Sequence, residues 1–176
     1  MSTTLRRPTD TEYASFYAGY VGLVPEGDLF ASLEQQAADT QKLLRPIGEA
    51  TSLYRYAPDK WSVREVIGHV ADSERVFAYR ALRFARADAT PLPGYDEKQW
   101  GVTTNAHSRT LVSLLDDLHA LRAATLTLFR GFADADWDRS GTANNHPVTV
   151  RALAYIVAGH ERHHMRIVRE RYLPST

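Results

Sequence analysis

The sequence contains no cysteine, which excludes disulfide bonds, thiolate metal ligands and a cysteine nucleophile. An excess of one charge is also missing, because 21 Lys and Arg residues balance 21 Asp and Glu residues for a net charge of zero. This balance gives the chain no overall electrostatic attraction to nucleic acid or to anionic membranes. We therefore expect neither a nucleic acid nor a membrane among its partners.

Long apolar runs are absent as well. No stretch approaches the roughly 20 apolar residues of a membrane-spanning helix. The first residues include Arg6 and Arg7 but no apolar segment after them, unlike a secretory signal. A cytoplasmic location is therefore the expectation. With 176 residues, 44% of them hydrophobic, the chain suits a single domain, 1–176, with its own core.

Apolar residues recur with a helical period in four stretches, 28–50, 62–87, 108–132 and 147–172. Ser62 and Glu65 form a capping-box pattern at the start of the second stretch, and Pro147 suits the first turn of the fourth. Little in the sequence alternates as a strand does. We therefore expect an all-α protein with the architecture of a four-helix bundle.

Two further segments modify this simple picture. Residues 88–107 form a long connection that is able to cross the bundle, so an up-down-up-down order is not assured. The N-terminal segment contains four aromatic residues, Tyr13, Phe16, Tyr17 and Tyr20, and we expect it to pack on the outside of the bundle as a short extra helix.

The most informative residues are HERHH, at 160–164, near the end of the fourth stretch. His160 and His164 lie about 40° apart on a helical wheel, one turn apart on one face. Three apolar residues fall on the same side, Leu153, Ile156 and Ile167. Both imidazoles therefore face the core, either as histidines that hydrogen-bond to their neighbours or as two ligands of one divalent metal ion. Two histidines in one register favour the metal.

A third ligand is needed, because a catalytic zinc-type centre usually has three protein ligands. His69 in the second stretch is the best candidate, although it lies about 120° from the middle of the apolar stripe and so at its flank. Glu74 falls in the middle of that stripe, where a carboxylate needs an arginine, a ligand histidine or a metal as partner. An ion pair between helices explains Glu74 equally well.

The same five residues also match the H-E-x-x-H signature of zinc proteases, in which Glu161 would be the general base. That interpretation requires a third ligand, and among the twelve residues after His164 only Glu170 is able to bind a metal. No strand-rich half that would bind a peptide is evident. The protease is therefore the less favoured alternative, and Glu161 is more simply a charged residue beside the ligand face.

Three blocks of the sequence match known motifs in their order and spacing. The blocks are KWSVREVIGHVADS at 60–73, PGYDEKQW at 93–100 and HERHH at 160–164. The first resembles the second-helix signature of the DinB-like (YfiT-like) superfamily, the second resembles the segment that follows it, and the third resembles the closing H-x-x-H-H motif. The likeness covers nearly the whole chain.

This resemblance implies a four-helix bundle with up-down-down-up connectivity, usually as a homodimer. It also implies a metal site formed by His69, His160 and His164, with nickel or zinc as the bound ion. Similar proteins include bacillithiol S-transferases and mycothiol-dependent isomerases, and others are named metal-dependent hydrolases. The chain departs from its relatives at Glu74 and Glu161, where other side chains often stand.

The leading hypothesis is a metal-dependent enzyme for a small-molecule substrate, either S-transferase-like or hydrolase-like. Its metal would lower the pKa of water to about 7 or hold a low-molecular-weight thiol as thiolate. Asp72 and Glu74 are candidates for orienting the ligands or transferring protons, while Tyr95, Asp96 and Trp100 are candidates for the pocket wall. Two non-enzymatic alternatives are a metal-binding stress-response bundle and a nucleic-acid or stress-response partner.

Overall fold

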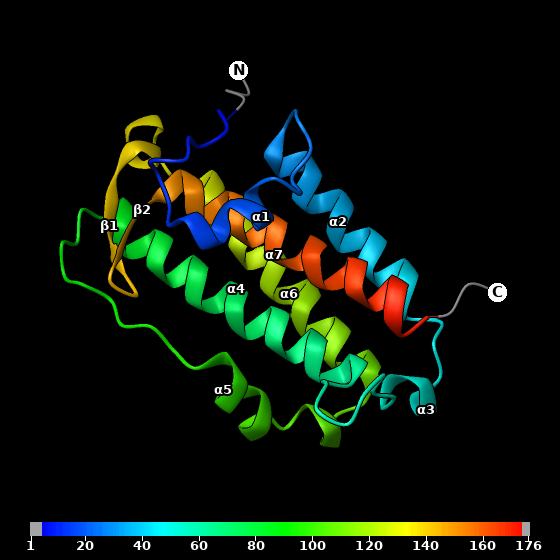
Figure 1. Cartoon of the computed structure of the whole chain (residues 1–176). Helices are drawn as coiled ribbons and strands as arrows, with labels where there is room; N and C mark the ends of the chain where they lie inside the picture. The colour runs from blue at the N-terminus through cyan, green and yellow to red at the C-terminus, as the bar shows by residue number, and fades with distance from the viewer. Residues whose placement is uncertain (1–4, 174–176) are drawn as a thin grey trace.

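The bundle consists of four long helices, and the computed structural model describes residues 5–173 (Figure 1). The helices are α2 (Leu29–Leu44), α4 (Val63–Ala85), α6 (Leu111–Arg130) and α7 (Val150–Arg171). Figure 1 shows α4 and α6 running in one direction and α2 and α7 in the other. This is the up-down-down-up connectivity, and it confirms the expected all-α four-helix bundle.

Each long helix begins at a residue whose side chain accepts a backbone hydrogen bond from the first turn. Ser62 and Glu65 form the complete capping box at the start of α4, as the sequence predicts. Asp28 and Thr110 cap α2 and α6 in the same way. The prediction for the fourth helix is wrong at its start, because α7 begins after the cap Thr149 and Pro147 lies in a strand.

Two apolar clusters fill the bundle, one on each side of a polar layer. One cluster lies toward the hairpin end and includes Phe77, Phe84 and Leu153. The other lies toward the end of α7 and includes Ile67, Leu115 and Val168. Between them, each of the four helices contributes polar side chains that are buried, namely Gln36, Thr40, Ser73, Glu74, Arg122, Thr125, His160 and Glu161. Buried polar groups need partners, so this layer requires a chemical explanation.

A small β-hairpin precedes α7 and was not expected from the sequence. Strands β1 (Ser140–Ala143) and β2 (His146–Thr149) pair antiparallel, with Gly141 opposite Val148. The turn residues Asn144 and Asn145 have φ of 50° and 64°, as a two-residue hairpin turn requires. The four-residue strands are too short to show a recognisable alternation.

The N-terminal segment forms a 3₁₀ turn, η1 (Ser15–Tyr17), followed by the short helix α1 (Ala18–Val21), which packs on α7. This confirms the predicted extra helix. The backbones approach closely, because a Cβ atom at Gly159 would lie 2.0 Å from the carbonyl oxygen of Tyr20. Glycine at 159 therefore lets α1 sit directly against α7, one residue before His160.

Short helices complete the connections: α3 (Glu49–Ser52), α5 (Glu97–Thr103), and the 3₁₀ turns η2 (Ala106–Ser108) and η3 (Asp134–Asp138). Helix α5 lies within the long connection between α4 and α6 and contacts α4 (Figure 1). Within residues 5–173, no helix has the length and apolar character needed to cross a membrane.

Candidate metal centre

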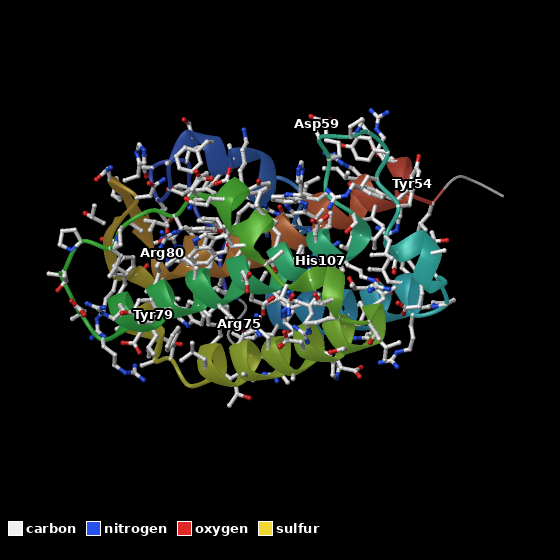
Figure 2. The ribbon with its side chains drawn as sticks, turned by 90° about the horizontal axis from the view of Figure 1, so that it is seen from below. Tyr54, Asp59, Arg75, Tyr79, Arg80 and His107 are labelled. Carbon is white, nitrogen blue, oxygen red and sulfur yellow. The ribbon has the colours of Figure 1, made fainter. Side chains whose placement is uncertain are left out.

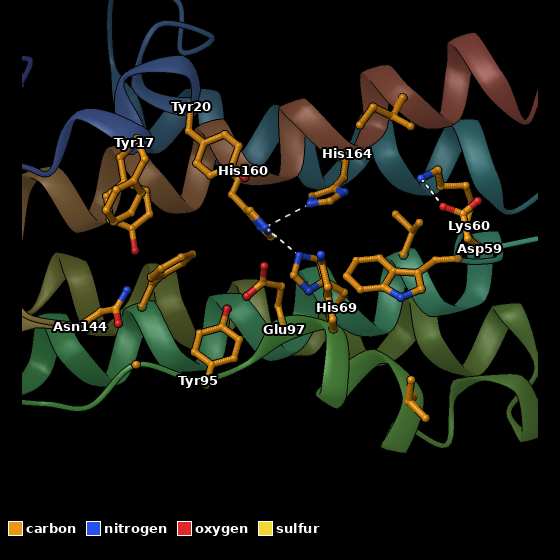
Figure 3. A pocket seen from close by; sticks show the side chains of 18 of the residues that line it. Tyr17, Tyr20, Asp59, Lys60, His69, Tyr95, Glu97, Asn144, His160 and His164 are labelled. Atoms are coloured by element: carbon orange, nitrogen blue, oxygen red, sulfur yellow. Dashed lines mark hydrogen bonds and ion pairs between the residues drawn. The ribbon is translucent and has the colours of Figure 1, made fainter. Parts of the chain in front are cut away.

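Three histidine side chains meet where α4 and α7 lie side by side (Figure 3). The Nε2 atoms of His69 and His160 are 3.0 Å apart, and those of His164 and His160 are 3.2 Å apart. One ligand nitrogen from each of the three residues lies within 4.8 Å of the others. The structure thus brings together the three histidines that the resemblance singled out.

The position of His69 follows from how α4 is surrounded. The apolar stripe of α4 packs toward the bundle interior, and its flank faces the groove between α4 and α7. Helices α1 and α5 border that groove on the side away from α2 and α6 (Figure 1). A residue at the flank of the stripe therefore projects toward α7, next to His160.

All three imidazoles are neutral at pH 7. Burial lowers the pKa of His69 to about 4. Burial and the neighbouring imidazoles lower the pKa of His164 to about 3 and hold that of His160 well below its usual value. A neutral imidazole presents a nitrogen lone pair, which is the form that binds a metal.

The nitrogen spacing fits a shared divalent ion. Two nitrogens that each lie about 2.0–2.1 Å from one metal are separated by about 2.9–3.4 Å at ordinary ligand angles. The observed separations of 3.0 and 3.2 Å fall in this range. One proton cannot satisfy both contacts of the central His160 Nε2, whereas a cation accepts all three lone pairs. The donor set therefore suits a transition ion such as zinc or nickel.

Aromatic side chains fix the orientation of the rings. Trp61 lies against His69 with ring centroids 4.6 Å apart, and Tyr20 meets His160 edge to face at 5.3 Å. Helix α5 supports Trp61 closely, because a Cβ atom at Gly101 would lie 2.6 Å from the Trp61 Nε1 atom. Preorganised ligands of this kind need little rearrangement to bind an ion.

Glu161 does not face the histidine cluster. It is 1% exposed and accepts hydrogen bonds from Arg122 at 2.7 Å, from Thr40 at 2.7 Å and from Gln36. Burial raises its pKa, but Arg122 and these hydrogen bonds outweigh burial and hold the pKa below its usual value. A carboxylate held inside the bundle in this way is unable to act as the general base of a protease. The protease alternative is therefore wrong. Glu161 is a charged residue next to the ligand His160, as expected, but it is buried and paired with Arg122.

Glu74 forms the second half of this buried network. Its two carboxylate oxygens accept hydrogen bonds from Arg122 at 2.9 and 2.7 Å. Of the partners that the sequence left open, the structure shows the interhelix ion pair. Glu74 does not line the cavity beside the histidines, so its placement contradicts a direct role in proton transfer.

Asp72, the other carboxylate predicted to assist the chemistry, is also displaced from the site. It is partly exposed and pairs with Arg75 on the same helix at 3.3 Å. Like Glu74, it is not among the residues that line the cavity. On a helical wheel Asp72 lies only about 60° from His69, so the sequence could not show that His69 reaches the cavity and Asp72 does not.

The histidines form one wall of a cavity of about 1010 Å³. Tyr95 lines it as expected, and its hydroxyl lies 2.8 Å from the Ser73 hydroxyl. Trp100 does not line the cavity but packs on Tyr95 with centroids 4.6 Å apart, and Asp96 caps α5. The lining also includes residues that the sequence had not indicated for the site, among them Tyr20, Trp61, Arg80 and Glu97. Arg80 shares a helical face with His69, and this shared face is the one sequence feature that indicated a place for Arg80 near the site.

A family model described as the DinB superfamily matches residues 32–168. The chain belongs to the DinB superfamily. Among relatives of this DinB protein, one from Bacillus licheniformis is 30% identical over 165 residues, covering 80% of this chain and 89% of that protein. One from Oceanobacillus iheyensis is 25% identical over 114 residues, covering 62% of this chain and 64% of that protein. Both are named "putative metal-dependent hydrolase".

The fold of this DinB protein matches a solved structure. YfiT from Bacillus subtilis superimposes with a TM-score of 0.72, covering 94% of this chain and 93% of YfiT at 18% identity. YfiT is described as a probable metal-dependent hydrolase with an unusual four-helix bundle topology. The likeness supports the up-down-down-up arrangement seen in Figure 1.

Proposed function

We propose that this DinB protein is a metal-dependent enzyme in which His69, His160 and His164 hold one divalent transition ion. The main support is that three neutral imidazole nitrogens converge on the wall of an open cavity. Nickel and zinc both suit this donor set. The names of the B. licheniformis and O. iheyensis relatives favour hydrolysis of a small molecule as the reaction.

A divalent metal on three neutral ligands supplies Lewis acidity, which lowers the pKa of water or of a thiol at neutral pH. The chain's own residues bind and orient the reactants. Figure 3 shows Glu97 directed into the cavity beside His69. Its carboxylate is the candidate to accept the proton that the nucleophile loses, a role that the sequence assigned to Asp72 or Glu74.

Thiol transfer is the second candidate, and the size of the cavity favours it. A volume of about 1010 Å³ is at the upper end of the usual range for small-molecule sites and leaves room for two reactants. Because the chain has no cysteine, any thiol must come from a separate low-molecular-weight cofactor. A bundle that binds metal without turnover is the non-enzymatic alternative.

The first test is elemental analysis of untagged protein beside its His69→Ala and His164→Ala variants. We expect about one nickel or zinc ion per chain in the wild type and none in either variant. His119→Ala, an exposed histidine on α6, is the matched control and should keep the metal. Equal metal content in all four proteins would refute the three-histidine site.

The reaction class is tested with the metal-loaded protein on a panel of small esters, amides and electrophiles, each with and without added thiol. Turnover without thiol supports hydrolysis, and turnover that requires thiol supports transfer. Metal binding without turnover in either arm supports the non-enzymatic bundle.

We propose further that residues 1–176 form one domain that works as a cytoplasmic homodimer. Sedimentation of the purified protein tests the homodimer, which would have a mass of twice 19.8 kDa.

A further inference from the structure

Arg80 is a buried cation without an anionic partner. Its exposed fraction is 3%, and one guanidinium nitrogen donates to the carbonyl oxygen of Pro93 at 2.8 Å. In residues 5–173, no carboxylate oxygen lies within 4.0 Å of a guanidinium nitrogen of Arg80, which is the distance limit for an ion pair. A guanidinium has five N–H donors, and burying its charge unpaired is costly. A second partner for Arg80 is therefore expected from outside the chain.

The free side of Arg80 borders the cavity. Figure 2 shows Arg80 on the edge of α4 opposite to that of Tyr79 and Arg75. Burial raises the pKa values of Tyr17 and Tyr95, and the positive charge of Arg80 partly offsets this rise at both hydroxyl groups. One guanidinium and two phenol hydroxyl groups thus gather at this end of the cavity.

The histidines lie at the other end. Arg80 follows His69 by eleven residues, which is about three helical turns and about 16 Å along α4. The two side chains therefore share one face of the helix. Ser73 and Phe77 occupy the turns between them, and Phe77 also lines the cavity. This face of α4 offers a cation at one end, an apolar surface in the middle and the proposed metal ligands at the far end.

We propose that Arg80, assisted by Tyr17, binds the carboxylate of an elongated amphipathic substrate whose apolar middle lies on Phe77 and Tyr95. The planar fork of a guanidinium matches a carboxylate with two parallel hydrogen bonds. The assignment of the reacting end to the histidines rests on the proposed function, whereas the carboxylate subsite needs no metal. Glu97 lies beside His69 in Figure 3, and its negative charge also acts on the Tyr17 and Tyr95 hydroxyl groups, but it forms no ion pair with Arg80.

The test uses two probes with the same apolar body, 6-phenylhexanoate and 6-phenylhexanamide. Calorimetric titration measures their affinity for the wild type with its metal and after chelation. Hydrogen bonds to a charged group predict that the carboxylate binds about 10- to 150-fold more tightly than the amide in both forms. Equal affinity of the two probes for the wild type would overturn the proposal.

Variants test whether Arg80 causes the preference for the carboxylate probe over the amide probe. Arg80→Met should abolish the preference for the carboxylate and leave the amide affinity unchanged. Arg83→Met is the matched control on α4, since Arg83 pairs with Asp88 and does not line the cavity. A preference that survives in Arg80→Met but disappears on chelation would show that the carboxylate binds the metal instead, and it would refute the subsite.

Failure of the metal site and failure of the Arg80 subsite give different results in these experiments. If the protein binds no metal, the proposed function fails, yet the two probes still report on Arg80. If Arg80→Met does not fold, Tyr17→Phe replaces it, with a several-fold loss of carboxylate affinity expected and an unchanged amide affinity. Unaltered carboxylate binding in Tyr17→Phe would contradict the hydroxyl contact and, with it, the proposed subsite.

Discussion

Arg122 joins two buried glutamates in the middle of the bundle. It is 2% exposed, and its guanidinium donates to Glu74 on α4 and to Glu161 on α7. Burial lowers the pKa of Arg122, but the two carboxylates outweigh burial and raise the pKa above its usual range. The arginine is therefore charged at every accessible pH, and each glutamate depends on it for compensation.

Replacing this arginine should be strongly destabilising. Arg122→Met leaves two carboxylates buried without a cation, and breaking a buried ion pair typically costs about 3–5 kcal/mol. Denaturant unfolding measures the loss. Arg130→Met on the same helix removes an exposed pair with Glu34 and should change the unfolding free energy by less than about 1 kcal/mol. Similar stabilities for the two variants would contradict the structural role of Arg122.

Glu97 is the residue to test for proton transfer. Glu97→Gln keeps the shape of the side chain but removes the proton acceptor, so we expect kcat to fall about 10²- to 10⁴-fold with unchanged metal content. Kinetics with whichever substrate the panel identifies provide the measurement. Glu170→Gln, an exposed change on α7, should retain full activity. Full activity in Glu97→Gln would exclude this role.

Only some individual residues of the candidate site were predictable from the sequence. The spacing of His160 and His164 predicts two imidazoles on one face, because four residues make about one turn. The helical wheel left His69 at the flank of its stripe, since a wheel does not show which neighbour a flank faces. Arg122 was not predictable for a related reason. The sequence does not distinguish a buried arginine from a solvent-exposed one until its partners on other helices are known.

At the scale of the elements, the short N-terminal helix is attached to α7 by a backbone contact. Gly159 has no side chain where the Tyr20 carbonyl approaches α7, and Tyr20 in turn meets His160 edge to face. The helix thereby connects the packing of the N-terminal segment to the orientation of a ligand.

Adding a methyl group at this contact should separate the two elements. Gly159→Ala is expected to cost about 1–3 kcal/mol through overpacking and to weaken metal affinity as Tyr20 leaves His160. Thermal unfolding and metal titration measure both effects. Gly19→Ala in α1 is the control, because a Cβ atom there meets nothing within 4 Å and should be neutral or slightly stabilising. Identical behaviour of the two variants would contradict the close approach.

Glu12 joins the N-terminal segment to the hairpin and to α7. Burial raises its pKa, but hydrogen bonds from Arg6, Thr9 and Thr149 and the charge of Arg151 outweigh burial and lower the pKa to about 2. Because the folded pKa is below the ordinary value of 4.5, its stabilisation is complete above pH 4.5 and declines as the pH falls toward about 2.

The pH dependence of unfolding tests this link. Between pH 6 and pH 2, we expect the stability difference between the wild type and Glu12→Gln to shrink as Glu12 is protonated. Denaturant unfolding at several pH values gives the two curves. Parallel curves over that range would show that the carboxylate does not make these contacts in solution.

The elements themselves differ in how far the sequence predicts them. The four long helices have both periodic apolar stripes and capping residues, and these two signals agree. The hairpin and α5 have no room for a periodic pattern, because their strands and helix span four and seven residues. Their positions depend on packing against α4, as with Gly141, whose missing Cβ would lie 2.2 Å from the Phe84 ring.

At the scale of the whole molecule, the proposed site connects the two helices at the centre of the bundle. His69 belongs to α4 and the other two histidines to α7, and these antiparallel helices pack side by side. The up-down-down-up order makes this possible, because the long connection through α5 lets α4 and α6 run parallel. Helical periodicity alone left that order open, and the family resemblance supplied it.

A metal that binds only the folded protein stabilises the whole bundle. At a free metal concentration about 100 times the Kd, the gain is about 2.7 kcal/mol, which corresponds to a rise in Tm of about 5–10 °C for a chain of this length. Calorimetry of the protein before chelation, after chelation and after reloading with zinc or nickel measures the shift. His164→Ala should melt at one temperature in all three states, and His119→Ala should follow the wild type. A shift of the same size in His164→Ala would mean that the metal stabilises the bundle from somewhere other than the junction of α4 and α7.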